Sequence, residues 1–149
     1  MRALGFPLVL VVCSPLNVTA QTLTISGGDA ELEEALKAAA LSLTLPEDAV
    51  AADYVATARG DYARLLAVLY ENAFFGPTIS IALAGQEASR LSPLRTPSAT
   101  RPVQIRIDRG PKFAFGQTSI GPLAPGASSP ADLETGQNAT TAEIRRAAR

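Results

Sequence analysis

Two segments in which apolar and polar residues strictly alternate constrain the fold of this chain most. Residues 78–83 and 103–108 each follow this pattern. Their apolar positions are Ile79, Ile81, Leu83, Val103, Ile105 and Ile107. Alternation with a period of two is typical of a β-strand with one apolar face and one face in water. Each predicted strand therefore needs a second layer to cover its apolar face.

Two amphipathic helices predicted earlier in the chain supply this layer. Residues 30–40 consist almost entirely of strong helix formers. A second helix is predicted from Ala51 or Arg59 to about Ala73, followed by Gly76 in a left-handed conformation that ends it. The stripe expected to face the core consists of Tyr62, Leu65, Leu66, Leu69, Tyr70 and Ala73. The charged residues expected on the solvent side are Asp61, Arg64 and Glu71.

The order of elements predicts an α+β fold with a β-α-α-β-β arrangement. Residues 22–25 alternate as well and are predicted to form a first short strand. The simplest way to bury every apolar face is to place both helices on one side of a three-stranded sheet. We assign this unit to residues 21–110, with a surface loop over residues 87–100. Residues 111–149 are predicted to begin a second such unit, which ends in a helix capped by Thr140 or Thr141.

The first twenty residues are predicted to be a secretory signal peptide. A positive start at Arg2 precedes an uncharged apolar run over residues 3–13, which is shorter than the ~20 residues needed to span a bilayer. Small residues lead up to Ala20, so cleavage is expected after that residue. Cys13, the only cysteine, would leave with this segment, so the exported protein would contain no disulfide. A buried strand, a permanent anchor and lipidation at Cys13 are the alternatives.

The composition argues against several kinds of site. The chain has no histidine and a single cysteine, so neither a Ser-His-Asp or Cys-His catalyst nor a zinc site is expected. With 13 Lys and Arg against 14 Asp and Glu, it lacks the basic excess of a nucleic-acid-binding module. The acidic residues Glu47, Asp48 and Asp53 lack the spacing of a calcium loop. We therefore expect no cofactor, no metal, no nucleic-acid partner and no enzyme, with a small carboxylate-based hydrolase as the enzymatic alternative.

Two motifs resemble the polypeptide-transport-associated (POTRA) domain. Residues 61–76, DYARLLAVLYENAFFG, resemble the second helix of that domain and its LY…GYFG exit. Residues 103–116, VQIRIDRGPKFAFG, resemble the V-x-I-x-V-x-x-G-P-x-F-x-F-G stretch where one such domain leads into the next. Within the family, the similarity is to the periplasmic N-terminal part of TamA-like outer-membrane assembly proteins. Ala73 and Phe74 depart from the Gly-Tyr pair that is common in the family.

The resemblance implies that the chain binds unfolded outer-membrane or autotransporter polypeptides in the periplasm. Strand addition draws its affinity from the main chain and so tolerates many client sequences. The strand after the second helix is commonly exposed in this family. The client-binding edge implied here consists of Pro77, Thr78, Ile79, Ser80, Ile81, Ala82 and Leu83. Its solvent face, formed by Thr78, Ser80 and Ala82, is predicted to be small and uncharged. Covering of this edge by a neighbouring domain or by the loop over residues 87–100 is the alternative.

The resemblance also bears on partners and on the length of the whole protein. A TamB-like subunit of the inner membrane is a further candidate partner. Contact with the outer membrane is expected only through a C-terminal β-barrel, which needs at least eight strands, whereas this chain has about four short alternating segments. We therefore expect a fragment or a truncated product of a longer protein. A free-standing secreted or periplasmic binding protein of the same fold is the alternative.

Overall fold

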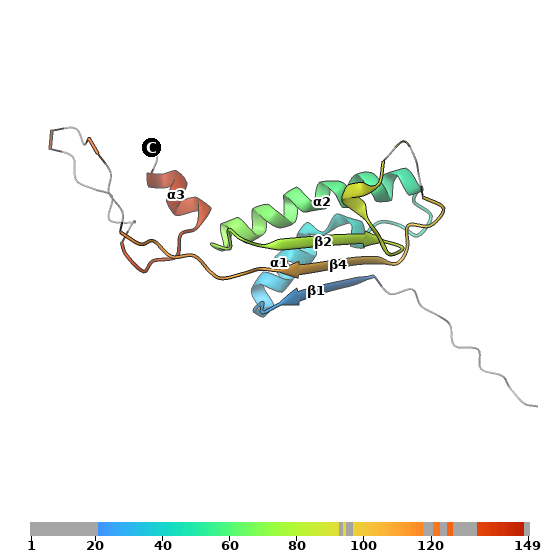
Figure 1. The fold of residues 1–149 in the computed structure, drawn as a ribbon, viewed down its shortest axis with the longest axis horizontal. Helices are drawn as coiled ribbons and strands as arrows, with labels where there is room; N and C mark the ends of the chain where they lie inside the picture. The colour runs from blue at the N-terminus through green and yellow to red at the C-terminus, as the bar shows by residue number, and fades with distance from the viewer. Residues whose placement is uncertain are drawn as a thin grey trace, which may run out of the picture.

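The chain forms an α+β fold, in which the two longer helices lie along one side of a mixed sheet (Figure 1). The computed structural model describes residues 21–92, 94, 97–117, 121–122, 125–126 and 134–147. The predicted signal segment, with its cleavage residue Ala20, lies outside the described residues. The elements are β1 (Thr22–Ser26), α1 (Ala30–Ala39), η1 (Leu41–Leu43), α2 (Ala51–Glu71), β2 (Thr78–Leu83), β3 (Gln86–Glu87), η2 (Ala88–Arg90), β4 (Val103–Asp108) and α3 (Thr141–Ala147).

The sheet has four strands in the order β1-β4-β2-β3, so β4 lies at its centre. β1 runs parallel to β4, with Thr22 opposite Gln104, and β2 runs antiparallel to β4, with Thr78 opposite Asp108. The predicted three strands are present, and the prediction missed β3 at the start of the expected surface loop. With only two residues, β3 is too short to show an alternating pattern. Ala84 and Gly85 connect it to β2 with positive φ angles of 48° and 80°, as a tight hairpin turn requires.

The core lies between one face of the sheet and the two helices α1 and α2. Val103, Ile105 and Ile107 on β4 are buried there, whereas Arg106 and Asp108 on the opposite face are exposed. The core residues that α1 and α2 bury against this face are Leu32, Leu36, Tyr54, Val55, Ala58, Leu65 and Leu69. The alternation of residues 103–108 thus predicted the two faces of the central strand correctly.

The face that α2 turns to the core differs from the predicted stripe. Leu65 and Leu69 are fully buried, but Leu66 and Tyr70 are only half-buried. Asp61, which was predicted to lie in water, is 0% exposed. That prediction was wrong because a polar residue can be buried when hydrogen-bond donors surround it. The residues that α2 buries are Tyr54, Val55, Ala58, Asp61, Leu65 and Leu69.

The donors around Asp61 come from the start of η1 and from its own helix. Its carboxylate accepts hydrogen bonds from the backbone N–H groups of Leu41 (3.1 Å) and Ser42 (2.9 Å). The Nε and Nη2 atoms of Arg64 donate to the same carboxylate at 3.0 and 2.6 Å. Since the first amides of a helical turn have no partner within that turn, Asp61 serves as the cap of η1 and ties it to α2.

The end of α2 is closed by Ala73 rather than by Gly76. Ala73 has a φ of 66°, and the N–H of Phe74 donates to the carbonyl of Leu69 at 2.9 Å. The N–H of Ala73 donates to the carbonyl of Tyr70 at 3.2 Å. These two bonds are those of a Schellman motif, in which the left-handed residue is usually glycine. Gly76 was expected to take that role and has no positive φ.

Beyond β4 the chain passes the end of α2 and meets a later segment. The N–H of Phe113 donates to the carbonyl of Ala73 at 2.8 Å, and the N–H of Ala139 donates to the carbonyl of Phe113 at 3.0 Å. Ala114 and Asn138 form an isolated antiparallel bridge. Thr140 caps α3, since its Oγ1 accepts a bond from the Glu143 N–H at 3.3 Å. The assignment of residues 111–149 to the start of a second unit stays a prediction.

Candidate functional site

The outer edge of β2 is the candidate site, and the register shows which backbone groups face it. Neighbouring residues of an antiparallel strand direct their N–H and C=O groups alternately to opposite sides. The N–H of Ala84 donates to the carbonyl of Pro102 at 3.0 Å, on the side of β4. The even-numbered residues of β2 therefore bond to β4. The residues that direct their N–H and C=O groups to the outer edge are Ile79, Ile81 and Leu83.

β3 occupies one end of this edge. Leu83 lies opposite Gln86, and Ala82 lies opposite Glu87. The chain then turns into η2 at Ala88, so no further strand residue faces Ile81. The side chain of Glu87 fills this position, because the N–H of Ile81 donates to Glu87 Oε1 at 3.3 Å.

Glu87 is held at the edge by hydroxyl groups from β2 and α2. Ser80 Oγ donates to Glu87 Oε2 at 2.7 Å, and the Tyr62 hydroxyl donates to Glu87 Oε1. The Tyr62 oxygen in turn accepts a bond from the Ile81 N–H at 3.3 Å. We call Tyr62, Ser80 and Glu87 the edge cluster. It joins α2, β2 and the end of β3 around the backbone amide of Ile81.

The edge cluster shifts the pKa values of both its ionisable groups. Partial burial works to raise the pKa of Glu87, but the hydrogen bonds from Tyr62, Ser80 and the Ile81 N–H outweigh it. With the nearby charge of Arg90, they hold this pKa below its ordinary value of 4.5. Burial and the bond to Glu87 raise the pKa of Tyr62 above 10.0. At neutral pH the cluster thus consists of a carboxylate that accepts bonds and a neutral phenol that donates one.

Acidification is expected to weaken this cluster. The pKa of Glu87 is lower in the folded protein than in the unfolded chain, where it is near 4.5. At pH values above 4.5 Glu87 therefore stabilises the fold fully. This stabilisation is lost as the pH falls through the pKa of the folded protein. We expect the urea midpoint of the wild type to fall more than that of Glu87→Gln between neutral pH and about pH 3. The two proteins differ only at this side chain, so the difference isolates Glu87. Equal losses in the two proteins would contradict the expectation.

The open part of the edge is shorter than the predicted segment. Thr78 is exposed, whereas Ile79 and Ser80 are half-buried and Ile81 and Leu83 are buried. The outward N–H of Ile79 has no hydrogen-bond partner among the described residues. The part of the edge that neither β3 nor the Glu87 side chain occupies thus runs from Pro77 to Ser80.

Ala82 lies on the helix-free face of the sheet as predicted, but it is buried there rather than exposed to water. It is only 8% exposed. Its register neighbours on either side are Gln104 and Glu87. Side chains directly opposite one another share one face of a sheet, so the small methyl group lies between two longer side chains.

A shallow groove on the helix-free face of the sheet adjoins the open part of this edge. It has a volume of about 190 Å³. Its lining residues are Thr24, Ser26, Thr78, Ser80, Arg106, Ile107 and Asp108. Four of these carry small hydroxyl side chains, and the charged side chains of Arg106 and Asp108 lie opposite Ser80 and Thr78 on the same face.

The sheet has a second edge, which the sequence analysis did not identify. β1 lies at the opposite end of the sheet from β3, and within the described ranges no strand pairs with its outer side. Thr22, Thr24 and Ser26 are exposed. The pattern of one strand does not show which neighbour lies beside it, so this edge could be found only from the parallel pairing of β1 with β4.

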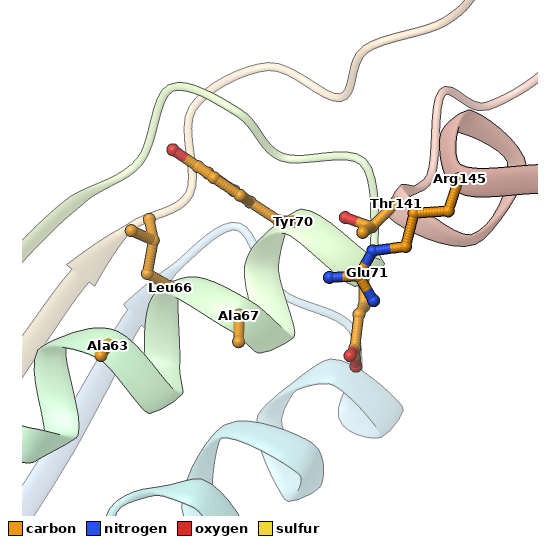
Figure 2. Close-up of a pocket in the computed structure, with 7 residues that line it drawn as sticks. All are labelled: Ala63, Leu66, Ala67, Tyr70, Glu71, Thr141 and Arg145. Carbon is orange, nitrogen blue, oxygen red and sulfur yellow. The ribbon is translucent and has the colours of Figure 1, made fainter. Parts of the chain in front are cut away.

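A pocket of about 290 Å³ lies between α2 and α3 (Figure 2). Its wall is formed mainly by apolar side chains of α2, with Glu71 and two residues of α3 at one end. The seven lining residues are Ala63, Leu66, Ala67, Tyr70, Glu71, Thr141 and Arg145. Leu66 and Tyr70 line this pocket, which explains why they are not in the core.

Neither a metal centre nor a membrane helix is found in the described part of the chain. No group of three acidic, His or Cys residues there is placed to hold a metal ion. None of the described helices combines the length and the apolar character needed to cross a bilayer. Comparisons with protein-family models, curated proteins and solved structures give no match to this chain.

Proposed function

We propose that this chain binds extended polypeptide segments in the periplasm by strand addition at the outer edge of β2. In this proposal it is the POTRA part of an outer-membrane protein or autotransporter assembly factor. The observation that carries the proposal is the outward N–H of Ile79, which no described residue accepts. Thr78 and Ser80 on either side of it are small and uncharged, so no charge at these positions repels a client.

The arrangement of the two POTRA-like motifs supports the proposal. The first motif ends in the segment from Ala73 to Gly76, and the second contains Gly110 and Phe113. The structure brings them together, since Phe113 bonds to Ala73 and a Cβ added at Gly110 would lie 2.9 Å from the carbonyl oxygen of Gly76. The edge of β2 thus begins where both motifs meet, next to the segment that leads out of the sheet.

The short open stretch suits weak and sequence-tolerant binding. A backbone hydrogen bond adds about 0.5–1.5 kcal/mol net, and association itself costs several kcal/mol. Ile79 offers one donor and one acceptor. Pro77 is also an odd-numbered residue, so its carbonyl faces the outer edge as a further acceptor. We therefore expect a single client strand to bind with a Kd no lower than about 1 mM. Such affinity would allow clients to be passed on.

Amide hydrogen exchange of the unmodified protein tests this function. A soluble peptide of about ten alternating Thr and Val residues, added at saturating concentration, is expected to slow exchange of the Ile79 amide at least about tenfold. The Ser80 amide bonds to β4 with or without peptide, so it serves as the internal reference. Protection at β1 instead would contradict the choice of edge. A peptide that protects neither edge would contradict strand addition.

A matched set of variants separates the backbone of Ile79 from its side chain. Ile79→Pro removes the outward N–H and should abolish peptide binding, whereas Ile79→Ala keeps that N–H and should still bind. Ser80→Pro removes an N–H that bonds to β4, so we expect it to destabilise the sheet itself. Circular dichroism and a urea midpoint for each variant show whether lost binding reflects lost structure.

A further inference from the structure

The amide of Ile81 is the next outward donor on β2 after that of Ile79, two residues further along the strand. A client strand that bonds to Ile79 would meet Ile81 two residues further along, where its next N–H and C=O groups face β2. In the structure this amide donates to Glu87 Oε1 and to the Tyr62 hydroxyl, both at 3.3 Å. Each distance is longer than the usual 2.7–3.2 Å. The amide is thus shared between two long hydrogen bonds and is bound weakly.

The Glu87 carboxylate occupies the position that the backbone carbonyl of an added strand would take. β3 ends at Glu87 and the chain turns away in η2, so only the side chain continues along the edge of β2. Its remaining bonds come from the hydroxyls of Ser80 and Tyr62, which are side chains that can rotate. Glu87 is half-buried, so solvent can hydrate the carboxylate when it moves away.

A place for the displaced side chain lies next to it. A pocket of about 410 Å³ is lined by Gly85, Gln86, Glu87, Arg90 and Leu91. Arg90 carries the opposite charge. Because Glu87 and Arg90 both line this pocket, it offers space and an opposite charge to a carboxylate that rotates away from Ile81.

We propose that the Glu87 side chain competes with the client strand for the Ile81 N–H. The client must displace Glu87 from this amide before it can pair with both Ile79 and Ile81. This proposal rests on the proposed function, because it concerns the same edge. With Glu87 in place, a client pairs only at Ile79. With Glu87 displaced, the client also bonds to Ile81 and stops at β3, which blocks the edge at Ala82 and Leu83. Glu87 thereby limits how long and how tightly a client is held.

The test compares binding of the same Thr-Val peptide to the wild type, Glu87→Ala and Glu87→Gln. Glu87→Ala removes the competitor and is expected to bind about tenfold tighter, since one more pair of backbone bonds forms and only the long bond to the Tyr62 hydroxyl must first be broken. Glu87→Gln keeps an acceptor of the same shape and should bind within about threefold of the wild type. With the peptide bound, the Ile81 amide should become more protected in Glu87→Ala than in the free variant.

The outcomes separate this inference from the function on which it rests. Unchanged or weaker binding by Glu87→Ala, with the Ile79 amide still protected, overturns the competitor role and leaves strand addition intact. Loss of Ile79 protection in all three proteins overturns strand addition itself. Should Glu87→Ala fail to fold, Ser80→Ala removes one hydroxyl that holds the carboxylate and is expected to tighten binding by a few fold. No gain with Ser80→Ala would then overturn the competitor role.

Discussion

Replacing Asp61 with alanine is expected to lower the free energy of unfolding by about 2–4 kcal/mol, because two backbone amides lose their acceptor. Asp61 is 0% exposed and accepts the backbone N–H groups of Leu41 and Ser42. Alanine would leave both amides without an acceptor, and each unsatisfied buried group costs about 1–3 kcal/mol. Urea unfolding followed by circular dichroism would measure the change.

Two further variants show which bonds of Asp61 matter. Arg64→Ala should cost less than Asp61→Ala, because the Arg64 side chain is 38% exposed and water can replace it at the carboxylate. Asp61→Asn keeps one acceptor oxygen for the amides of η1, and its loss should lie between the other two. A loss below about 1 kcal/mol for Asp61→Ala would show that η1 does not depend on this cap.

Gly110→Ala is expected to destabilise the fold by about 2–3 kcal/mol through backbone strain and a steric clash. Gly110 has a φ of 66°, and a Cβ built there would lie 2.9 Å from the carbonyl oxygen of Gly76. This neighbour is backbone, so a side-chain rotation cannot relieve the clash. The contact lies where β4 leaves the sheet, so the variant should also disturb the approach of Phe113 to Ala73. Thermal unfolding would measure the loss.

Two other glycines provide matched controls for Gly110. Gly85 has a φ of 80° but no atom within 4 Å of an added Cβ, so Gly85→Ala should cost only the left-handed strain of about 1–2 kcal/mol. Gly76 has neither a positive φ nor a close neighbour for a Cβ, so Gly76→Ala should change stability by less than about 0.5 kcal/mol. If Gly110→Ala were no worse than Gly85→Ala, the contact with Gly76 would not be a steric limit.

The regular part of the fold could be predicted because its strands each have one wet face. Ile105 and Ile107 alternate with Arg106 and Asp108, and the structure buries the first pair and exposes the second. The helices were found from their composition and the spacing of their apolar residues. Local patterns of this kind depend on near neighbours in sequence, so a single chain shows them directly.

The errors arose where a long-range contact overrides the local pattern. Asp61 looks like a solvent-facing residue of α2 until η1 is placed beside it, some 20 residues away in sequence. Leu66 and Tyr70 continue an apolar stripe, but they line the pocket that α2 shares with α3. Both errors concern which residues of α2 face the core, and this depends on the rotation of the helix about its axis. The apolar stripe alone defines that rotation only to within about one residue position.

The candidate edge was found only in part for the same reason. The sequence placed a strand at residues 78–83, and the position of this strand beside β4 follows from pairing that its own pattern does not encode. Glu87 stood in an expected loop, and its contact with Ile81 needs the hairpin at Ala84 and Gly85 to fold back. The tight turn was the available signal, since an Ala-Gly pair after an alternating segment is compatible with a hairpin.

The parallel pairing of β1 with β4 has a consequence for the order in which the protein folds. Thr22 lies opposite Gln104, so the two partners are separated by about 80 residues. Contacts between residues so far apart require the closure of a large loop and slow folding relative to local contacts. During synthesis β1 is made first, but its partner emerges only after both helices and β2. The first strand of this sheet to be synthesised can therefore pair only after the last one, β4, has been made.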